Sequence, residues 1–334
     1  MAKKTPLDMI AAIQRHAAGP NLNSGQNQSA ICQEQAAFWD WLCSQIASCA
    51  QDHHLPDENS LPFADIWSPY AAATATFLTH TDANPVFVRD LQRALLHRLC
   101  ALGQEPLWHM FETWRGAGPS MIAALGPPVA TEVVPRDQYL SFVDMQCRNN
   151  LADLMQAYPV LQRLIPTDLA FGVARARDLQ ARLQKDRDAL NKVFGIPPQA
   201  VLCEVNFGAG DTHQQGASVC LLRFAWADQH RALVYKPRDM ALEAAFHDLL
   251  GKIDAETAGP SLPRLKTYLG AGYGYMEFAE SRPCATAAEL TQFYHTAGRL
   301  CAILYVLGFT DGHLQNFVAQ GPNLYLVDVF GPSI

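Results

Sequence analysis

Three side chains near the end of the chain have the types and spacing of a phosphoryl-transfer site. Asp311 and Asn316 bracket four residues in the run TDGHLQN at 310–316, and Asp328 follows a short predicted hairpin. In such a site the first Asp faces the acceptor hydroxyl, while the Asn and the second Asp hold magnesium ions. Considered alone, the same residues could be ordinary loop formers after a helix. The hypothesis therefore depends on what lies upstream.

A glycine-rich hairpin is the first upstream feature, in the run GAGDTHQQG at 208–216. Its glycines Gly208, Gly210 and Gly216 would let the backbone approach a phosphate closely. A glycine-rich turn is often no more than a turn, so this feature is weak by itself. Its place between the first two predicted strands is the one that protein kinases use for the loop over ATP.

The third predicted strand ends in Lys236, where protein kinases have the lysine that holds the α- and β-phosphates. Glu243 on the next predicted helix is the candidate partner of this lysine, and Glu277 belongs to a predicted hinge strand at 275–278 whose backbone would meet adenine. A strand-end lysine or a helical glutamate is usually solvated. Here, however, hairpin, lysine, helix, hinge strand, long helix, Asp-x4-Asn loop and second Asp occur in kinase order, and chance rarely produces so many ordered elements.

Two histidines allow a different interpretation of the same region. His213 and His313 could be metal ligands, because neutral imidazole binds zinc well. Neither has a third candidate ligand near it in the sequence. A zinc site is therefore the weaker hypothesis.

Composition narrows the possible class of protein. A length of 334 residues predicts two domains, and a formal net charge of -7 gives no basic footprint for nucleic acid. The nine cysteines form no Cys-x-x-Cys pair, which is typical of free thiols in a reducing compartment. No apolar run reaches membrane-spanning length. We therefore expect a cytoplasmic protein with no transmembrane segment.

Hydrophobic periodicity divides the chain into three parts. Residues 1–30 are predicted to be a flexible lead-in, because they end in a polar, turn-rich run. Residues 31–195 have the helical period almost throughout, apart from a loop at 116–135 that is rich in glycine and proline. From 196 onward, short β-rich runs at 201–205, 218–224 and 232–235 predict an antiparallel sheet, and helices follow at 240–253 and 287–307. The predicted fold class is α+β: a helical N-terminal region, then a kinase-like two-lobed domain with an antiparallel N-lobe and an incomplete helical C-lobe.

Taken together, these motifs resemble the dehydratase domain of class II lanthipeptide synthetases (LanM type). The resemblance covers roughly residues 137–330. It depends on a helix over 139–161 and on the motifs GDTH at 210–213 with Gly216, YKPR at 235–238, YGYMEF at 273–278, TD-x-H-x-x-N at 310–316 and VD at 327–328. Departures from the family pattern are Gln315 in place of Glu, Val329 and Phe330 in place of Leu-Glu, and Ala217 in place of Arg.

The resemblance implies a function in lantibiotic biosynthesis. Members of the family phosphorylate Ser and Thr of a ribosomal precursor (leader-core) peptide with Mg-ATP and then eliminate the phosphate. By position, Lys236 would hold phosphates, while Asp311 and His313 would serve the acceptor. Asn316 and Asp328 would hold magnesium. The remaining candidate cofactor-binding residues are Gly208, Gly210, Asp211, His213, Gly216, Glu243 and Glu277.

Family members continue beyond the point where this chain stops at Ile334. We therefore expect residues 196–334 to be a kinase-like dehydratase core truncated at its C-terminus, with a separate elimination or cyclase protein as a candidate partner. Two alternatives stay open. One is a catalytically silent module that binds a peptide or a partner protein, and the other is a non-functional fragment of a larger synthetase, which would expose apolar surface around 300–307 and aggregate.

Overall fold

A computed structural model of the chain describes residues 5–18, 25–48, 61–81, 84–116, 137–208 and 218–329. The chain separates into two compact units, the first ending at Arg182 and the second beginning at Leu183. The boundary therefore precedes the expected one at 195/196. The reason is that helix α9 (Arg187–Phe194) packs against strand β4 (Thr267–Gly270), so it belongs with the sheet.

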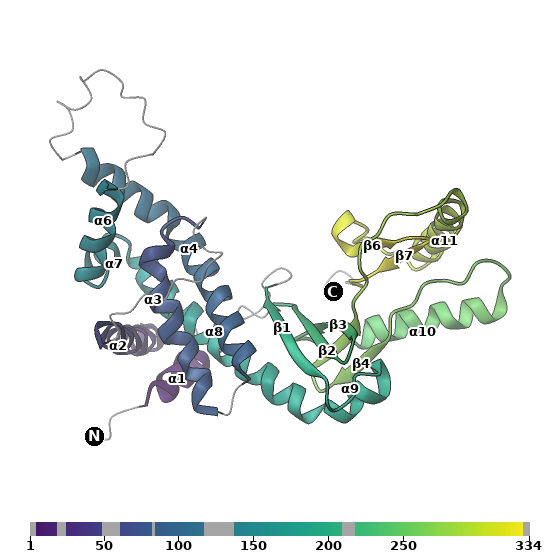
Figure 1. Ribbon diagram of the computed structural model, residues 1–334, viewed down its shortest axis with the longest axis horizontal. Helices are drawn as coiled ribbons and strands as arrows, with labels where there is room; N and C mark the ends of the chain where they lie inside the picture. The colour runs from purple at the N-terminus through teal and green to yellow at the C-terminus, as the bar shows by residue number, and fades with distance from the viewer. Residues whose placement is uncertain are drawn as a thin grey trace, which may run out of the picture. The chain divides into compact units, whose positions relative to one another are not determined.

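The first unit consists of helices (Figure 1). They are α1 (Pro6–Ala18), α2 (Gly25–Ser48), α3 (Ala64–Ala75), the 3-10 helix η1 (Thr76–Thr81), α4 (Pro85–Gly116), α6 (Asp137–Arg148), α7 (Ala152–Ala157) and most of α8 (Pro159–Lys185). Large rings fill the interior of this unit, and Phe38, Trp67 and Phe142 are completely buried. Aromatic side chains bury the most apolar area per residue, so they contribute strongly to the stability of a helical unit.

Helix α1 corrects the expectation of a flexible lead-in. The Thr5 hydroxyl accepts a hydrogen bond from the Asp8 N–H at 3.2 Å, and the Thr5 N–H donates to the Asp8 carboxylate at 2.9 Å. This reciprocal pair is a capping box, with Pro6 at the first helical position. Ile10 and Ile13 on this helix are buried. The Thr-x-x-Asp spacing was the sequence signal for this helix start.

Two prolines lie inside helices, where proline is normally unfavourable. Helix α4 passes through Pro106, and α8 passes through Pro166. Proline weakens a helix interior because it lacks an N–H and crowds the preceding turn. In α4, Leu99 and Leu107 on either side are fully buried. Tertiary packing of this apolar face therefore outweighs the local cost.

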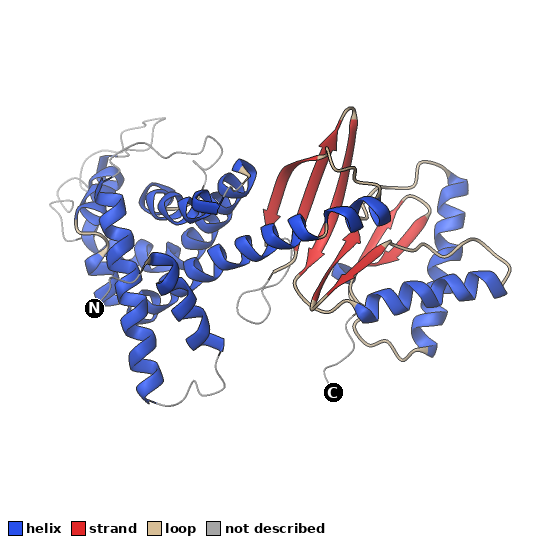
Figure 2. Ribbon diagram, turned by 90° about the horizontal axis from the view of Figure 1, so that it is seen from below, coloured by secondary structure: helices blue, strands red, loops and turns tan. Residues whose placement is uncertain are grey.

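The second unit has a sheet and a smaller hairpin, both drawn as strands in Figure 2. The sheet is antiparallel throughout, in the order β1-β2-β3-β5-β4. Its strands are β1 (Val201–Phe207), β2 (Cys220–Trp226), β3 (Gln229–Lys236), β4 and β5 (Tyr273–Glu277); β6 (Phe317–Gln320) and β7 (Asn323–Leu326) form the hairpin; α10 (Ala241–Glu256), α11 (Ala287–Val306) and the 3-10 turn η3 (Leu314–Asn316) complete the unit. The α+β class with an N-terminal helical region is confirmed, as are the predicted strands.

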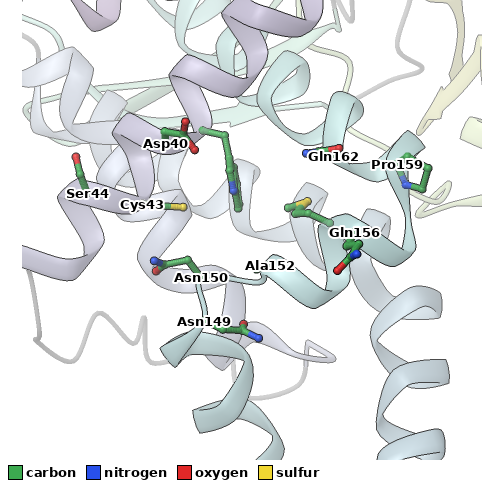
Figure 3. A pocket seen from close by; sticks show the side chains of 11 residues that line it. Asp40, Cys43, Ser44, Asn149, Asn150, Ala152, Gln156, Pro159 and Gln162 are labelled. Atoms are coloured by element: carbon green, nitrogen blue, oxygen red, sulfur yellow. The ribbon is translucent and has the colours of Figure 1, made fainter.

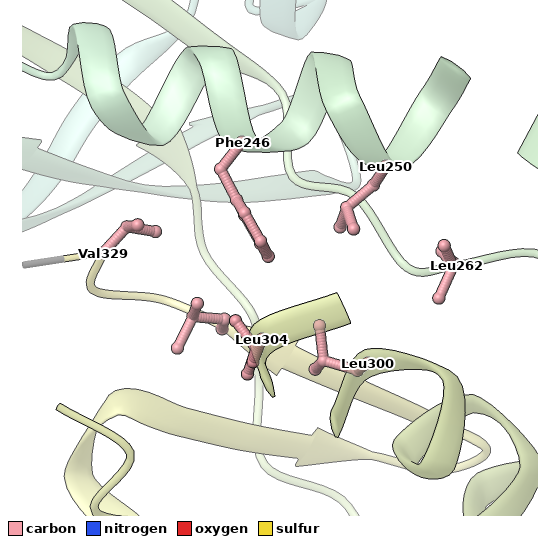
Figure 4. Close-up of a cluster of buried hydrophobic side chains, with 7 residues drawn as sticks. Phe246, Leu250, Leu262, Leu300, Leu304 and Val329 are labelled. Carbon is pink, nitrogen blue, oxygen red and sulfur yellow. The ribbon is translucent and has the colours of Figure 1, made fainter. Parts of the chain in front are cut away.

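Two apolar clusters hold the hairpin in the second unit. The first joins α10 to α11 and to the residues after β7, with Phe246 and Leu250 facing Leu300, Leu304 and Val329 (Figure 4). The second joins β5 to the hairpin; it contains Met240, Leu265, Met276 and Ala279, with Val318, Tyr325 and Val327 packed against them. The hairpin and the end of β7 are thereby fixed beside the sheet. Both predicted magnesium ligands belong to this hairpin region.

The described helices include none that is long and apolar enough to cross a membrane.

Candidate functional site

Lys236 is the last residue of β3, and its side chain is buried. The alternation of the strand places Tyr235 and Lys236 opposite Tyr275 and Gly274 of β5, and Pro237 then ends the strand. Only 3% of Lys236 is exposed. Its Nζ atom donates to the carbonyl oxygen of Val327 at 2.7 Å. Burial lowers the pKa of Lys236, and the nearby carboxylates of Asp328 and Glu243 oppose that shift.

Glu243 lies in the first turn of α10 and is completely buried. Its Oε1 atom is 3.4 Å from Lys236 Nζ, so the structure brings together the predicted lysine and its predicted partner. The Oε2 atom is buried and has no hydrogen-bond partner within the described structure. A buried carboxylate requires compensating positive charge. Lys236 supplies part of that charge.

Asp328 joins Lys236 and Glu243 in one group of charged side chains, the Lys236 cluster. Its Oδ1 atom is 3.5 Å from Lys236 Nζ, and its side chain is partly exposed. Asp328 follows β7 closely, and the N–H of the preceding residue, Val327, donates to the carbonyl oxygen of Asn316 at 2.9 Å. The β6–β7 hairpin therefore holds Asn316 and Asp328 at its base, because Phe317 and Leu326 are paired there. These two residues are the predicted magnesium ligands.

Asp311 and Asn316 are also in contact. The Asn316 amide donates from Nδ2 both to the backbone carbonyl oxygen and to the Oδ2 atom of Asp311, each at 2.9 Å. His313 Nε2 lies 3.4 Å from Asp311 Oδ1. Asn316 is buried, whereas Asp311 and His313 are substantially exposed. The carboxylate predicted to face the acceptor is therefore held in place by a buried amide and is open to solvent.

Several predicted residues lie elsewhere or outside the described chain. Gly210, Asp211, His213 and Gly216 fall outside the described residues. Gly208 directly follows β1 and has φ at 92°, a backbone conformation that favours glycine. Glu277 lies along the β3–β5 ladder from Lys236, and its carboxylate is 3.3 Å from Arg231 Nη1.

The backbone of Glu277 restricts how a base could bind at the hinge. The Glu277 N–H donates to the carbonyl oxygen of Lys266 at 2.9 Å, and the Phe278 N–H is directed at the Ala232 carbonyl oxygen. An adenine ring could therefore bind either N–H only by breaking a bond of the sheet. The hinge role of this strand remains a prediction.

Arg238 is a member of the cluster that was not among the predicted site residues. Its Nη2 atom is 2.5 Å from Asp328 Oδ1 and 2.5 Å from Glu243 Oε1. The residue lies in the YKPR motif, two positions after Lys236, but sequence reasoning assigned it no role. The spacing alone could not reveal that a side chain just after the strand turns back over the same two carboxylates.

Residues 158–329 match the family described as "Domain of unknown function (DUF4135)". The chain belongs to the DUF4135 family. The lacticin 481/lactococcin biosynthesis protein LcnDR2 of Lactococcus lactis subsp. lactis is 26% identical to this chain over 105 residues. That alignment covers 29% of this chain and 11% of the relative, so the chain spans only a small part of the relative's length. The predicted resemblance is confirmed at the level of a LanM-like domain.

The DUF4135 range contains the whole Lys236 cluster and the Asp311–Asn316 pair. Their oxygen atoms suit magnesium, which takes carboxylate and carbonyl ligands and completes its shell with water and substrate phosphates. Asp328 could supply a carboxylate oxygen, and Asn316 could supply Oδ1, since its Nδ2 is directed at Asp311. Within the described ranges, no three His, Cys, Asp or Glu side chains converge as a metal site. Asp328 and Asn316 could hold an ion that shares its coordination with water and phosphates.

A buried histidine lies one turn after Glu243 on α10. Both ring nitrogens of His247 are buried and lack a hydrogen-bond partner in the described structure. Burial lowers the pKa of His247 from 6.5 to about 4, and the Glu243 carboxylate partly opposes the shift. At neutral pH this imidazole is uncharged. It contributes no positive charge to the cluster.

The first unit of the protein also contains a pocket of about 790 Å³. Figure 3 shows Asp40, Cys43 and Ser44 on one side of it, with Asn150 and Gln156 across from them. This volume lies in the range of small-molecule sites. Asn149 and Gln162 add further carboxamides to its lining. None of the predicted site residues lines this pocket.

Proposed function

We propose that this chain acts in lanthipeptide biosynthesis as a kinase-type phosphotransferase. It would use Mg-ATP to phosphorylate Ser and Thr of a ribosomal precursor peptide, the first step of dehydration. The biosynthetic context rests on the LanM-like domain and on the lacticin 481 relative. The observation that carries the reaction class is the junction at Val327, where Lys236 meets the base of the hairpin that holds Asn316 and Asp328.

Each residue would have a role that its position supports. Asp311 would orient the acceptor hydroxyl and receive its proton as the new O–P bond forms and the bond to ADP breaks. Lys236 would neutralise phosphate charge, with Glu243 fixing its orientation. Magnesium, held by Asp328 and Asn316, would supply charge neutralisation at the transferring phosphoryl group. Catalysis of this kind consists of positioning and electrostatic stabilisation.

We assign only the phosphorylation step to the residues described here. We place the reaction in the cytoplasm, where ATP is available and thiols stay reduced. The eight cysteines among the described residues are free, which suits that compartment.

Thermal unfolding with and without Mg-ATP tests the proposal. A ligand that binds only the native state must raise the apparent stability. We expect a magnesium-dependent rise of the melting temperature in the wild type that Lys236→Ala and Asp328→Asn both lose. The matched controls are Lys252→Ala and Asp228→Asn, which change exposed residues of the same unit. A cooperative wild type with no shift would instead favour the silent binding module.

A nucleotide-binding result still has to be separated from catalysis. ADP formation from Mg-ATP should rise when a Ser- and Thr-containing precursor peptide is added, and Asp311→Asn should abolish that rise while retaining the thermal shift. This split is expected because Asp311 serves the acceptor and does not hold the nucleotide. A peptide-independent ADP level, equal in wild type and Asp311→Asn, would contradict the assigned reaction.

A further inference from the structure

Two cations share the same two carboxylate oxygens in the Lys236 cluster. Arg238 Nη2 lies 2.5 Å from both Asp328 Oδ1 and Glu243 Oε1. Lys236 Nζ lies 3.5 Å and 3.4 Å from the same two atoms. The arginine is therefore the nearer cation to both carboxylates. Arg238 Nη1 donates to the carbonyl oxygen of Asp239 at 3.2 Å, which steadies the guanidinium.

The charges of this cluster balance only with Arg238 included. Glu243 and Asp328 carry two negative charges, and Lys236 and Arg238 carry two positive ones. A guanidinium stays protonated under all ordinary conditions, so its charge is permanent. Without Arg238, two carboxylates that share a buried lysine would repel each other with one uncompensated charge between them.

We infer that Arg238 is a positioning residue that sets how tightly this site binds a divalent metal ion. A fixed positive charge beside Asp328 Oδ1 opposes a second cation on the same carboxylate. Metal binding is thereby kept weak until nucleotide phosphates add negative charge and further ligands. The inference rests on the proposed function, since it takes Asp328 as a metal ligand.

The same charge has the opposite effect on an anion. Arg238 adds positive potential where triphosphate oxygens would lie, so it should favour a nucleotide that arrives without metal. Replacing Arg238 by a neutral residue should therefore strengthen metal binding and weaken metal-free nucleotide binding. A residue that only supported the fold would weaken both when replaced. The two opposite shifts distinguish the inference from a general structural role.

Mn²⁺ alone is the probe for the metal half of the test, because its free form is counted directly by electron paramagnetic resonance. We expect Arg238→Gln to bind Mn²⁺ roughly tenfold more tightly than the wild type, since one positive charge beside the ligand is removed. Arg238→Lys should stay near the wild type, because it keeps the charge. Adding Asp328→Asn to Arg238→Gln should remove the gain.

Arg223→Gln is the matched control. It removes an arginine of the same unit whose carboxylate partner, Glu204, lies on the sheet surface, with both side chains exposed. Its Mn²⁺ affinity should equal that of the wild type. Metal-free ATP binding, measured by calorimetry with chelator present, should be several-fold weaker in Arg238→Gln and unchanged in the control.

The outcomes that overturn the inference are explicit. Equal or weaker Mn²⁺ binding in Arg238→Gln overturns it, and so does no measurable Mn²⁺ binding in either protein. If Arg238→Gln fails to unfold cooperatively, the comparison passes to Arg238→Lys, and a large affinity change there also overturns the inference. The proposed function fails separately, by the absence of a Mg-ATP thermal shift in wild-type protein that still shows the Mn²⁺ difference.

Discussion

Lys236 Nζ donates a 2.7 Å hydrogen bond to the backbone carbonyl oxygen of Val327. Val327 directly precedes Asp328, and its own N–H donates to the carbonyl oxygen of Asn316. One buried ammonium group thus ties the end of β3 to the base of the β6–β7 hairpin. The lysine that would hold phosphate also holds the segment that would carry magnesium. Replacing this lysine should therefore lower the stability of the protein even when no ligand is bound.

Lys236→Met should lower the free energy of unfolding by about 3 kcal/mol, because removing one partner of a buried ion pair leaves the other charge uncompensated. Urea unfolding of ligand-free protein measures this. Lys252→Met, an exposed change on α10, is the control and should cost less than about 0.5 kcal/mol. Equal stabilities for the two variants would show that the contact with Val327 contributes nothing.

Asn316→Ala should destabilise the ligand-free protein by about 1–3 kcal/mol. The change removes two hydrogen bonds to Asp311 from a residue that is 7% exposed. The neighbouring exposed Gln315→Ala provides the control in the same 3-10 turn. Thermal unfolding compares the two, and a larger loss in Gln315→Ala would be the contrary result.

Asp186 supports the sheet from its position just before α9. Its carboxylate accepts from the Tyr273 hydroxyl at 2.7 Å and from the Tyr268 hydroxyl at 3.3 Å. Asp186→Ala should cost about 2–3 kcal/mol, since hydroxyls hydrogen-bonded to a charged group lose their partner. Asp188→Ala changes an exposed carboxylate of α9 and should cost little. Denaturant unfolding measures both variants. A free energy of unfolding equal to that of the wild type in both would contradict this role of Asp186.

His247 should make the protein less stable in mild acid. Its pKa is lowered from 6.5 to about 4 in the folded state, so the unfolded chain takes up the proton first as pH falls. Stability is then lost progressively below pH 6.5, until the folded state also protonates near pH 4. The linkage predicts a loss of about 2 kcal/mol at pH 5 relative to pH 7.

His247→Met isolates this contribution from that of the carboxylates. The variant keeps an apolar side chain of good helix propensity in α10 and has no proton to bind. Its loss of stability between pH 7 and pH 5 should be smaller than that of the wild type by about 2 kcal/mol. Parallel pH profiles for the two proteins would refute the assignment.

The end of α11 exposes apolar side chains. Tyr305 is 88% and Val306 is 83% exposed, whereas Leu300 and Leu304 of the same segment are buried. The expectation of exposed apolar surface around 300–307 thus holds for part of the segment. Tyr305→Ser with Val306→Ser should reduce binding of a hydrophobic dye and self-association, because contiguous apolar surface favours both. If dye fluorescence and the size-exclusion elution volume of the variant equal those of the wild type, this apolar surface does not drive self-association.

Much of the second unit could be predicted from the sequence alone because its signals are local. The β-rich runs at 201–205 and 232–235 lie within β1 and β3, and the run at 218–224 overlaps most of β2, since alternation and turn residues specify short strands directly. Asp311 and Asn316 of the Asp-x4-Asn spacing are likewise close in sequence, and the Asn316 amide donates to the Asp311 carboxylate.

Long-range packing decided the rest. Buried leucines carry α4 through Pro106, which local propensity opposes. Arg238 and Asp328 are far apart in the sequence and meet only because the apolar clusters hold the hairpin beside the sheet. Side-chain types and spacing therefore determined which groups could do chemistry. Tertiary structure decided which charges share an oxygen atom, because that depends on contacts between segments that no local pattern encodes.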